Sequence, residues 1–158
     1  VDSQNPLLVE SMLGEYTFIQ QVQESSLWGE KWYLLDTGVP HLVCLTDTQS
    51  HIPESNSPHN AFLRGLRQKY NANVNIAYIQ DRKHIVYATY ERGVEDITLA
   101  CGTGAAAVMA LAYRFGLVDS QTTITPPSTE LLEVRIDSRN VVYLKGAVQR
   151  IAVCEVEA

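Results

Sequence analysis

Cys101 directly precedes a stretch of small and apolar residues, 102–115, in which only Arg114 is charged. A helix that is apolar on all sides must be wrapped by the rest of its domain, so residues 103–115 are predicted to form a buried central helix. The first N–H groups of a helix lack partners and carry partial positive charge, which favours a bound anion. Gly102 and Gly104 let a carboxylate or phosphate approach these amides closely.

The position of Cys101 predicts a stabilised thiolate, because a helix N-terminus lowers a cysteine pKa below its free value of about 8.5. A bound carboxylate beside a reactive thiol is a proton-transfer site in outline. Two other interpretations stay open. Cysteine is among the most often buried residues, so Cys101 can be purely structural. The glycines also match a dinucleotide-binding fingerprint, which needs an acidic residue about 20 positions further on. Residues 121–126 contain none.

Four further residues are candidates to act with Cys101. Arg92 can hold a substrate carboxylate with its planar guanidinium, and Glu91 can hydrogen-bond a thiol or an ammonium group. Such a pair is equally typical of a solvated surface. His41 is a common partner for activating a thiol, although a lone histidine is often structural. Asn75 lies in an otherwise apolar strand and needs partners if buried, such as a ligand amine or carboxylate. We assign no role to the other histidines, His51, His59 and His84.

The elements that must position these residues follow from hydrophobic periodicity. A peripheral helix is predicted over residues 58–70, with Ser57 as its cap and Pro58 in its first turn, and Gly116 is predicted to end the central helix. A polar loop covers residues 47–57. Strands are predicted over residues 13–22, 31–36, 41–46, 73–79, 84–90, 131–136, 141–144 and 150–156. This is an α+β layout in which a mostly antiparallel sheet or barrel wraps the buried helix, without the continuous βαβ alternation of a Rossmann domain.

Composition limits the class of protein. The chain has 158 residues, of which 46% are hydrophobic and 19% charged, as expected for one globular domain over residues 1–158. A net charge of −6 argues against nucleic acid or an anionic membrane as partner. The three cysteines show no metal-binding spacing, which predicts no metal and a cytoplasmic protein. Because Val1 is not an initiator methionine, we expect a piece of a longer chain.

Four motifs in order resemble the second half of diaminopimelate epimerase, from about residue 36 to residue 146. They are Gly38-x-Pro40-His41, Asn73-Val74-Asn75, Glu91-Arg92-Gly93 and Leu99-Ala100-Cys101-Gly102-Thr103-Gly104-Ala105. Proline racemases and phenazine-biosynthesis isomerases look like relatives of the same fold. The resemblance implies cofactor-independent inversion of an amino-acid α-carbon, between L,L- and meso-diaminopimelate, on the route to lysine and peptidoglycan. One cysteine removes the α-proton and a second delivers a proton to the other face.

The resemblance also implies roles for residues of this chain. Cys101 matches the second of the family's two cysteines, and Gly102 and Thr103 match the amide cradle for the α-carboxylate. Glu91 and His41 match the residues that support the two thiols. A helix N-terminus aimed at that carboxylate stabilises the charge that builds up when the proton leaves. A thiol suits the step because its pKa can be brought near ambient pH.

Two departures from the family pattern concern substrate and completeness. Arg92 and Asn75 match residues that grip the far end of the substrate, but Val39 replaces the family's asparagine there, which leaves a broader amino-acid racemase open. The family has two pseudo-symmetric halves, each with a cysteine at the start of a central helix, and residues 1–100 do not repeat that unit. Neither Cys44 nor Cys154 has the glycine-rich helix start, so neither is expected to be the second acid.

We therefore expect half an active site, inactive in isolation. The expected partners are a small-molecule amino-acid substrate, the missing N-terminal half of the same enzyme and, as a further possibility, a second copy in a homodimer. The last strand, about residues 147–158, is expected to belong with the missing domain and to be poorly ordered, swapped or folded back here. The alternative is a non-catalytic binding or assembly module of the same fold, whose open apolar face finds a partner.

Overall fold

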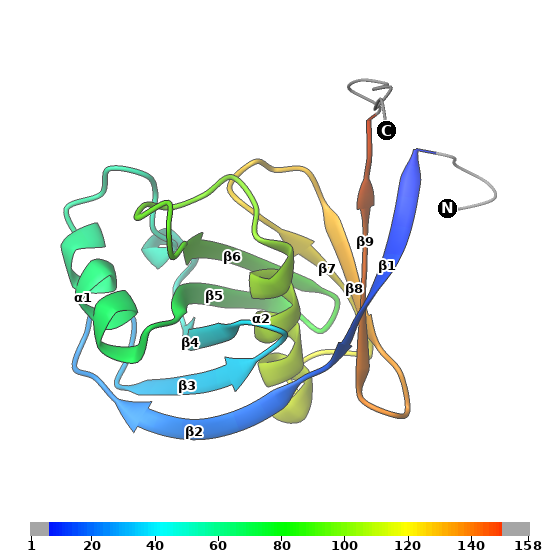
Figure 1. Cartoon of the computed structure of the whole chain (residues 1–158), viewed down its shortest axis with the longest axis horizontal. Coiled ribbons are helices and arrows are strands. Elements are labelled where there is room, and N and C mark those ends of the chain that lie inside the picture. Colours follow the sequence, from blue (N-terminus) through cyan, green and yellow to red (C-terminus); the bar gives the residue numbers. More distant parts are fainter. Residues whose placement is uncertain (1–6, 150–158) are drawn as a thin grey trace, which may run out of the picture.

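A strongly curled sheet surrounds one helix in the computed structural model of this chain, which describes residues 7–149 (Figure 1). The helices are α1 (Asn60–Tyr70) and α2 (Gly102–Arg114), with a short 3-10 turn at Gln49–His51. The strands are β1 (Leu8–Glu15), β2 (Thr17–Gln23), β3 (Lys31–Asp36), β4 (Pro40–Thr46), β5 (Asn73–Asp81), β6 (His84–Tyr90), β7 (Gln121–Thr125), β8 (Leu132–Ile136) and β9 (Val141–Ala147).

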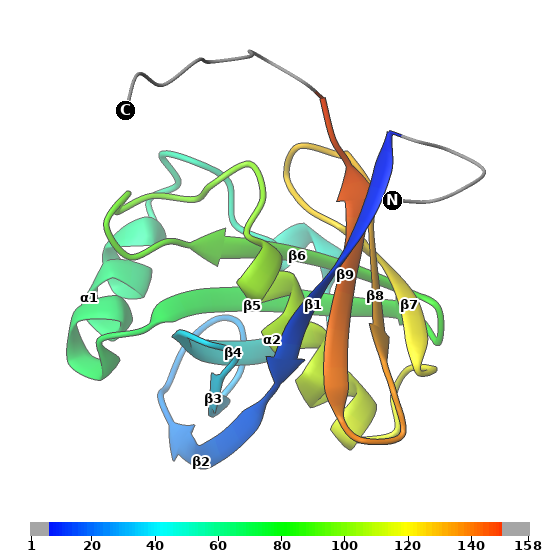
Figure 2. The same cartoon turned by 45° about the vertical axis from the view of Figure 1, so that its right-hand side comes forward.

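The strand order makes the sheet almost close on itself. Its order is β1-β9-β8-β7-β6-β5-β4-β3-β2, so the two edge strands are consecutive in the sequence. Figure 2 shows β1 lying along β9 and then running on into β2. Of the neighbouring strand pairs within residues 7–149, only β4 with β5 and β6 with β7 are parallel. These two pairs are joined through α1 and α2, respectively. The predicted α+β class with a mostly antiparallel sheet is confirmed.

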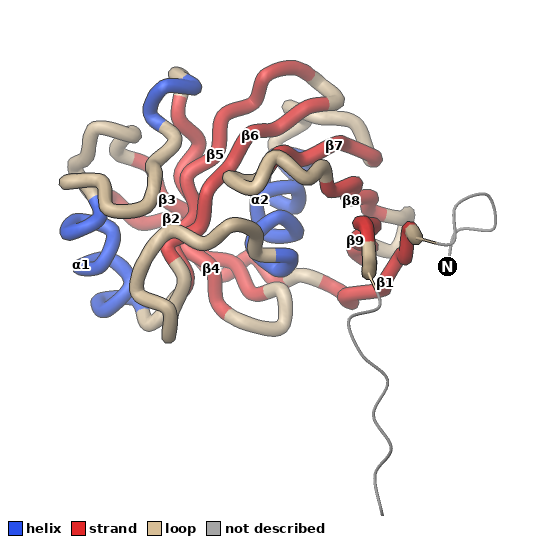
Figure 3. The backbone as a smooth tube through the Cα atoms, turned by 90° about the horizontal axis from the view of Figure 1, so that it is seen from above, coloured by secondary structure: helices blue, strands red, loops and turns tan. Residues whose placement is uncertain are grey.

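Helix α2 fills the inside of the curled sheet (Figure 3). All its residues from Gly104 to Ala112 are buried, which confirms the predicted central helix. Met109 and Leu111 are fully buried, and burial of each such side chain contributes about 1.5–3 kcal/mol. Gly116 has a φ of 69°, and its N–H donates to the carbonyl of Tyr113, so it ends the helix as predicted. No helix within residues 7–149 is long and apolar enough to cross a membrane.

The sheet separates two apolar cores because side chains alternate between its faces. Val43 of β4 and Tyr87 of β6 face the core around α2. Cys44 and Ala88, their neighbours in sequence, face the second core under α1. The same alternation puts His41 on the α2 side, two residues from Val43. A side chain of β4, β5 or β6 can therefore reach the start of α2 only if it lies on the inner face of the sheet.

The structure corrects two predicted boundaries and adds one strand. Residues 13–22 form parts of two strands rather than one, because Gly14 has a φ of 99° at a register shift and the chain then changes its partner from β9 to β3. Helix α1 begins at Asn60, since residues 57–60 form a turn in which the hydroxyl of Ser57 accepts from the N–H of His59. Strand β7 was not predicted. The last predicted strand, 150–156, lies outside the described residues.

Candidate active site

The backbone of Cys101 is held by one buried phenol. Cys101 is extended, with φ −135° and ψ 105°, and directly precedes the first residue of α2. Its N–H donates to the hydroxyl of Tyr87 at 3.1 Å, and the same hydroxyl donates to its carbonyl at 2.7 Å. That carbonyl also accepts from the N–H of Ala105, the first bond of the helix. The backbone N–H and carbonyl of Cys101 therefore both have hydrogen-bond partners, which fixes the orientation of this residue.

Two glycines let the start of α2 approach the sheet. A Cβ on Gly102 would lie 2.8 Å from Cδ2 of Leu144. A Cβ on Gly104 would lie 2.6 Å from Oδ1 of Asn75 and 2.7 Å from Oγ1 of Thr89. Gly102 and Thr103 are partly exposed, like Cys101. The carboxylate cradle at the first amides of α2 stays a prediction.

Burial changes the expected acidity of Cys101. Its pKa is raised above the ordinary thiol value, chiefly because partial burial removes water from the thiolate. The Thr103 hydroxyl, whose Oγ1 lies 3.6 Å from Sγ, and the Gly104 amide act in the opposite direction. The negative charge of Glu91 raises the pKa further. The prediction of a stabilised thiolate is therefore wrong for this chain, since desolvation outweighs the hydrogen bonds that lower the pKa.

His41 reaches the same site from β4. It is fully buried, and its Nε2 lies 3.1 Å from Oγ1 of Thr103, while its Nδ1 lies 3.0 Å from Nδ2 of Asn75. Burial lowers its pKa to about 4, so the ring is neutral at physiological pH. The structure thus brings His41 to the start of α2, 62 residues away along the chain. Asn75 is also fully buried and binds His41, Leu42 and Thr89 rather than facing the surface.

Glu91 and Arg92 open the loop that leads from β6 to Cys101. The N–H of Glu91 donates to the carbonyl of Asp96, and the Glu91 carbonyl accepts from Glu95, so the loop folds back on itself. Glu91 is partly buried, and its charge is one of the smaller causes that raise the pKa of Cys101. The guanidinium of Arg92 is exposed and donates to the carbonyl of Asn71 at 3.0 Å.

Asp96 ties this loop to the polar loop that precedes α1. Its carboxylate accepts from Asn60 at 2.9 Å, from its neighbour's N–H at 2.8 Å and from the hydroxyl of Ser55. These bonds lower the pKa of Asp96, and the bond from Ser55 has the largest effect.

Sequence reasoning missed the Asp96 carboxylate, together with Tyr87 and Thr89. Tyr87 and Thr89 are two residues apart, so they lie on the same face of β6, and this spacing could have identified them from the sequence.

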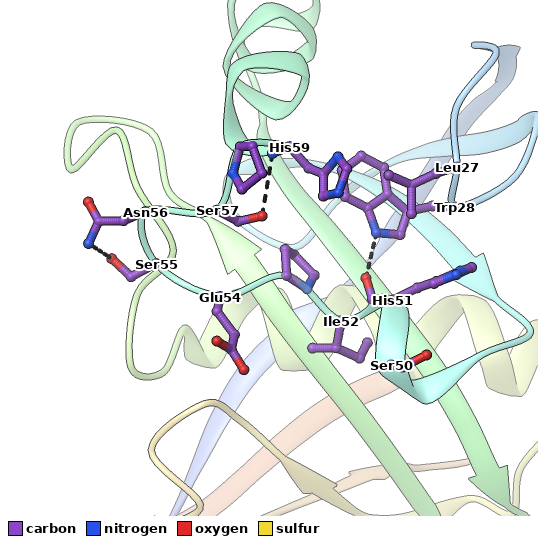
Figure 4. A pocket seen from close by; sticks show the side chains of 12 residues that line it. Leu27, Trp28, Ser50, His51, Ile52, Glu54, Ser55, Asn56, Ser57 and His59 are labelled. Atoms are coloured by element: carbon purple, nitrogen blue, oxygen red, sulfur yellow. Dashed lines mark hydrogen bonds between the residues drawn. The ribbon is translucent and has the colours of Figure 1, made fainter.

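The cavities described on the surface lie away from Cys101. Figure 4 shows one of about 390 Å³ between Trp28 and the polar loop, lined by His51 and His59 among others. The indole of Trp28 donates to the carbonyl of His51 at its edge. A second cavity, of about 400 Å³, is lined by part of the same loop and by Leu99. Since catalytic chemistry depends on the side chains present, we give more weight to the cluster around Cys101 than to either hollow.

Comparison with known proteins agrees with this geometry. A family model described as diaminopimelate epimerase matches residues 33–151. The chain belongs to the diaminopimelate epimerase family. Relatives named diaminopimelate epimerase include one from Nitratiruptor, 40% identical over 91% of this chain and 54% of that protein, and one from Helicobacter pylori, 40% identical over 94% of this chain and 57% of that protein. The chain therefore spans about half the length of these epimerases.

Solved structures show that the fold is shared more widely. A Pseudomonas aeruginosa protein named as a predicted epimerase superimposes with a TM-score of 0.71 at 18% identity, covering 96% of this chain and 59% of its own. A hydroxyproline epimerase from Agrobacterium vitis gives 0.66 at 15% identity, covering 93% of this chain and 51% of its own. At these identities the likeness establishes the fold alone. The predicted epimerase-like fold is confirmed.

Proposed function

We propose that this chain supplies one half of the active site of a cofactor-independent epimerase that interconverts L,L- and meso-diaminopimelate. The observation that carries the proposal is the partly exposed Cys101 at the start of buried α2, with Thr103 and His41 gathered beside it, in a chain of this family. The chain spans 54% and 57% of two of its relatives, which supports a second unit that provides the other cysteine.

The proposed reaction is a proton transfer across the α-carbon. A thiolate of the second unit takes the α-proton, and the thiol of Cys101 delivers its own proton to the opposite face; the reverse reaction exchanges these roles. Because burial raises the pKa of Cys101, it rests as the thiol and enters the reaction as the proton donor. The amides of Gly102 and Thr103 hold the α-carboxylate and stabilise the charge that develops on it.

The remaining residues are assigned to support and recognition. Glu91, whose charge acts on the pKa of Cys101, is proposed to accept a hydrogen bond from the substrate ammonium. The exposed guanidinium of Arg92 is proposed to bind the distal carboxylate once it leaves Asn71. His41 acts from beneath the site as a neutral side chain. Val39 lies in the turn before β4, and its lack of an amide favours a broader choice of amino acid as the alternative.

Exposed apolar side chains near the site support a covering partner. Val94, Leu99 and Leu131 are 59%, 73% and 62% exposed. Leu99 accepts at its carbonyl from the N–H of Ser128, which joins the two loops that carry Leu99 and Leu131. We propose that the second half of the epimerase covers this surface. The alternative is that the surface serves a non-catalytic assembly module or a homodimer. Sedimentation of the chain alone tests this alternative, because a self-associating chain would have the mass of a dimer or a larger assembly.

Deuterium incorporation tests the proposal. The 158-residue chain is compared in D₂O with a fusion to the part of the Helicobacter pylori relative that this chain does not match, using L,L-diaminopimelate as substrate. We expect α-deuterium with the fusion, none with the chain alone, and loss of incorporation in the fusion carrying Cys101→Ser. Cys44→Ser, on the far face of β4, is the matched control and should retain it. Incorporation that survives Cys101→Ser would refute the role of this cysteine.

A further inference from the structure

Five polar side chains form a continuous row beneath the start of α2. They come from three adjacent strands, the helix and the residue before it, and they are Thr89, Asn75, His41, Thr103 and Cys101. The first three are at most 1% exposed. In the sheet register Asn75 pairs directly with Thr89, so these two side chains lie side by side on one face. The neighbouring groups determine the direction of the first three hydrogen bonds in the row, from Thr89 to Thr103.

The amide of Asn75 can be oriented in only one way. The carbonyl of Leu42 lies 3.3 Å from Nδ2 of Asn75, and a carbonyl only accepts, so the amide nitrogen must face it. On the other side the hydroxyl of Thr89 donates to Oδ1 at 2.7 Å. A flipped amide would place two carbonyl oxygens against each other. The Asn75 nitrogen therefore also faces His41.

This orientation determines the tautomer of His41. An amide nitrogen only donates, so Nδ1 of His41, at 3.0 Å, must be unprotonated. Burial lowers the pKa of the ring to about 4, although the charge of Asp36 raises it, while that of Arg92 lowers it. A neutral ring with a bare Nδ1 carries its hydrogen on Nε2. That hydrogen is donated to Oγ1 of Thr103 at 3.1 Å.

The last step concerns the hydroxyl hydrogen of Thr103. Because its oxygen accepts from His41, the hydrogen points elsewhere, and Sγ of Cys101 lies 3.6 Å from the oxygen. We propose that Thr89 and Asn75 are positioning residues that hold His41 as the Nε2–H tautomer, so that Thr103 donates its hydrogen to the sulfur of Cys101. Within the proposed function, on which its purpose rests, this bond stabilises the thiolate left when Cys101 gives its proton to the substrate.

Nitrogen NMR of the 158-residue chain tests the tautomer directly. With ¹⁵N-labelled histidine and a His41→Gln sample for assignment, we expect His41 to show an unprotonated Nδ1 and a protonated Nε2 between pH 5.5 and 8. A protonated Nδ1 in this range would overturn the proposal without any need for a further variant. No substrate or turnover is involved, so failure of the proposed epimerase activity would not affect this result.

Two variants test the positioning residues. In Asn75→Asp the carboxylate only accepts, so Nδ1 of His41 must become protonated. In Thr89→Val the amide loses its anchor, and we expect a mixture of ring states, whereas Thr89→Ser keeps the hydroxyl and the wild-type signals. An unchanged bare Nδ1 in Asn75→Asp, or unchanged ring signals in Thr89→Val, would contradict the assigned roles. A purely structural role would alter stability in these variants but not the protonation of Nδ1.

The bond to sulfur is tested by the rate at which iodoacetamide alkylates Cys101. A charge-assisted hydrogen bond to the thiolate is lost in Thr103→Val, so we expect alkylation at pH 8 to slow about tenfold. Thr103→Ser should restore the rate to within about twofold of wild type. Equal rates for Thr103→Val and wild type would show that this hydroxyl does not donate to the sulfur.

Discussion

The hydroxyl of Tyr87 and the backbone of Cys101 make two hydrogen bonds with each other, of 3.1 and 2.7 Å. Tyr87 comes from the middle of β6, and Cys101 ends the loop that follows it. One side chain thus anchors both the chemical group and the start of α2. No other contact of Cys101 in the described residues satisfies its N–H, so the position of the thiol depends on this phenol.

Removal of the Tyr87 hydroxyl should therefore be costly. Tyr87→Phe keeps the buried ring but leaves the N–H of Cys101 without a partner, which costs about 1–3 kcal/mol. Urea unfolding of the chain measures this loss. Tyr143→Phe is the matched control, because its hydroxyl makes a longer bond, 3.4 Å, to Asp137 at a partly exposed position. A change within about 0.5 kcal/mol is expected there.

Gly104→Ala tests the close approach of α2 to the sheet. The new Cβ would meet Oδ1 of Asn75 and Oγ1 of Thr89 at 2.6 and 2.7 Å, so we expect a destabilisation of about 1–3 kcal/mol. Gly65→Ala in α1 is the control, since no atom lies within 4 Å of its Cβ. It should stabilise the chain by about 0.5–1 kcal/mol, because alanine favours helix. Thermal unfolding compares the two, and equal effects would contradict the packing described.

Thiol labelling should separate the two cysteines described. Burial raises the pKa of Cys44 to about 12, and that side chain is fully buried. Cys101 is partly exposed, and its pKa is raised as well. In a Cys154→Ser background, iodoacetamide should label Cys101 with a rate that increases as pH rises above 8, and Cys44 only after unfolding. Labelling of Cys101 that is already maximal at pH 7 would contradict the effect of burial.

His41 should make the chain less stable in mild acid. Its pKa is about 4 in the folded state and 6.5 when unperturbed, so only the unfolded chain takes up the proton between these values. The free energy of unfolding should therefore fall as the pH drops from about 6.5 to about 4, by about 3 kcal/mol, and change little above 7 from this group. His41→Asn removes the titrating ring. Urea unfolding at several pH values should show a shallower slope for this variant.

Much of the fold could be predicted because it depends on local patterns. The apolar stretch that becomes α2 is buried whatever surrounds it, and Gly116 ends it for a reason present in the chain itself. Strands β3 and β6 were predicted at their observed ends. Strand β7 was missed because it has only five residues, three of them threonine, which give a weak pattern. Its place between β6 and β8 depends on long-range pairing.

The candidate site also has a part that could be predicted from the sequence and a part that could not. The sequence by itself determined that Cys101 would precede a buried helix, and its motifs were sufficient for the family. Only the tertiary structure decided that Tyr87 holds Cys101, that Asn75 lies beneath His41, and that the thiol is made less acidic. The reason is physical. Strand register decides which side chains meet beneath α2, and desolvation by that packing raises the pKa of the thiol.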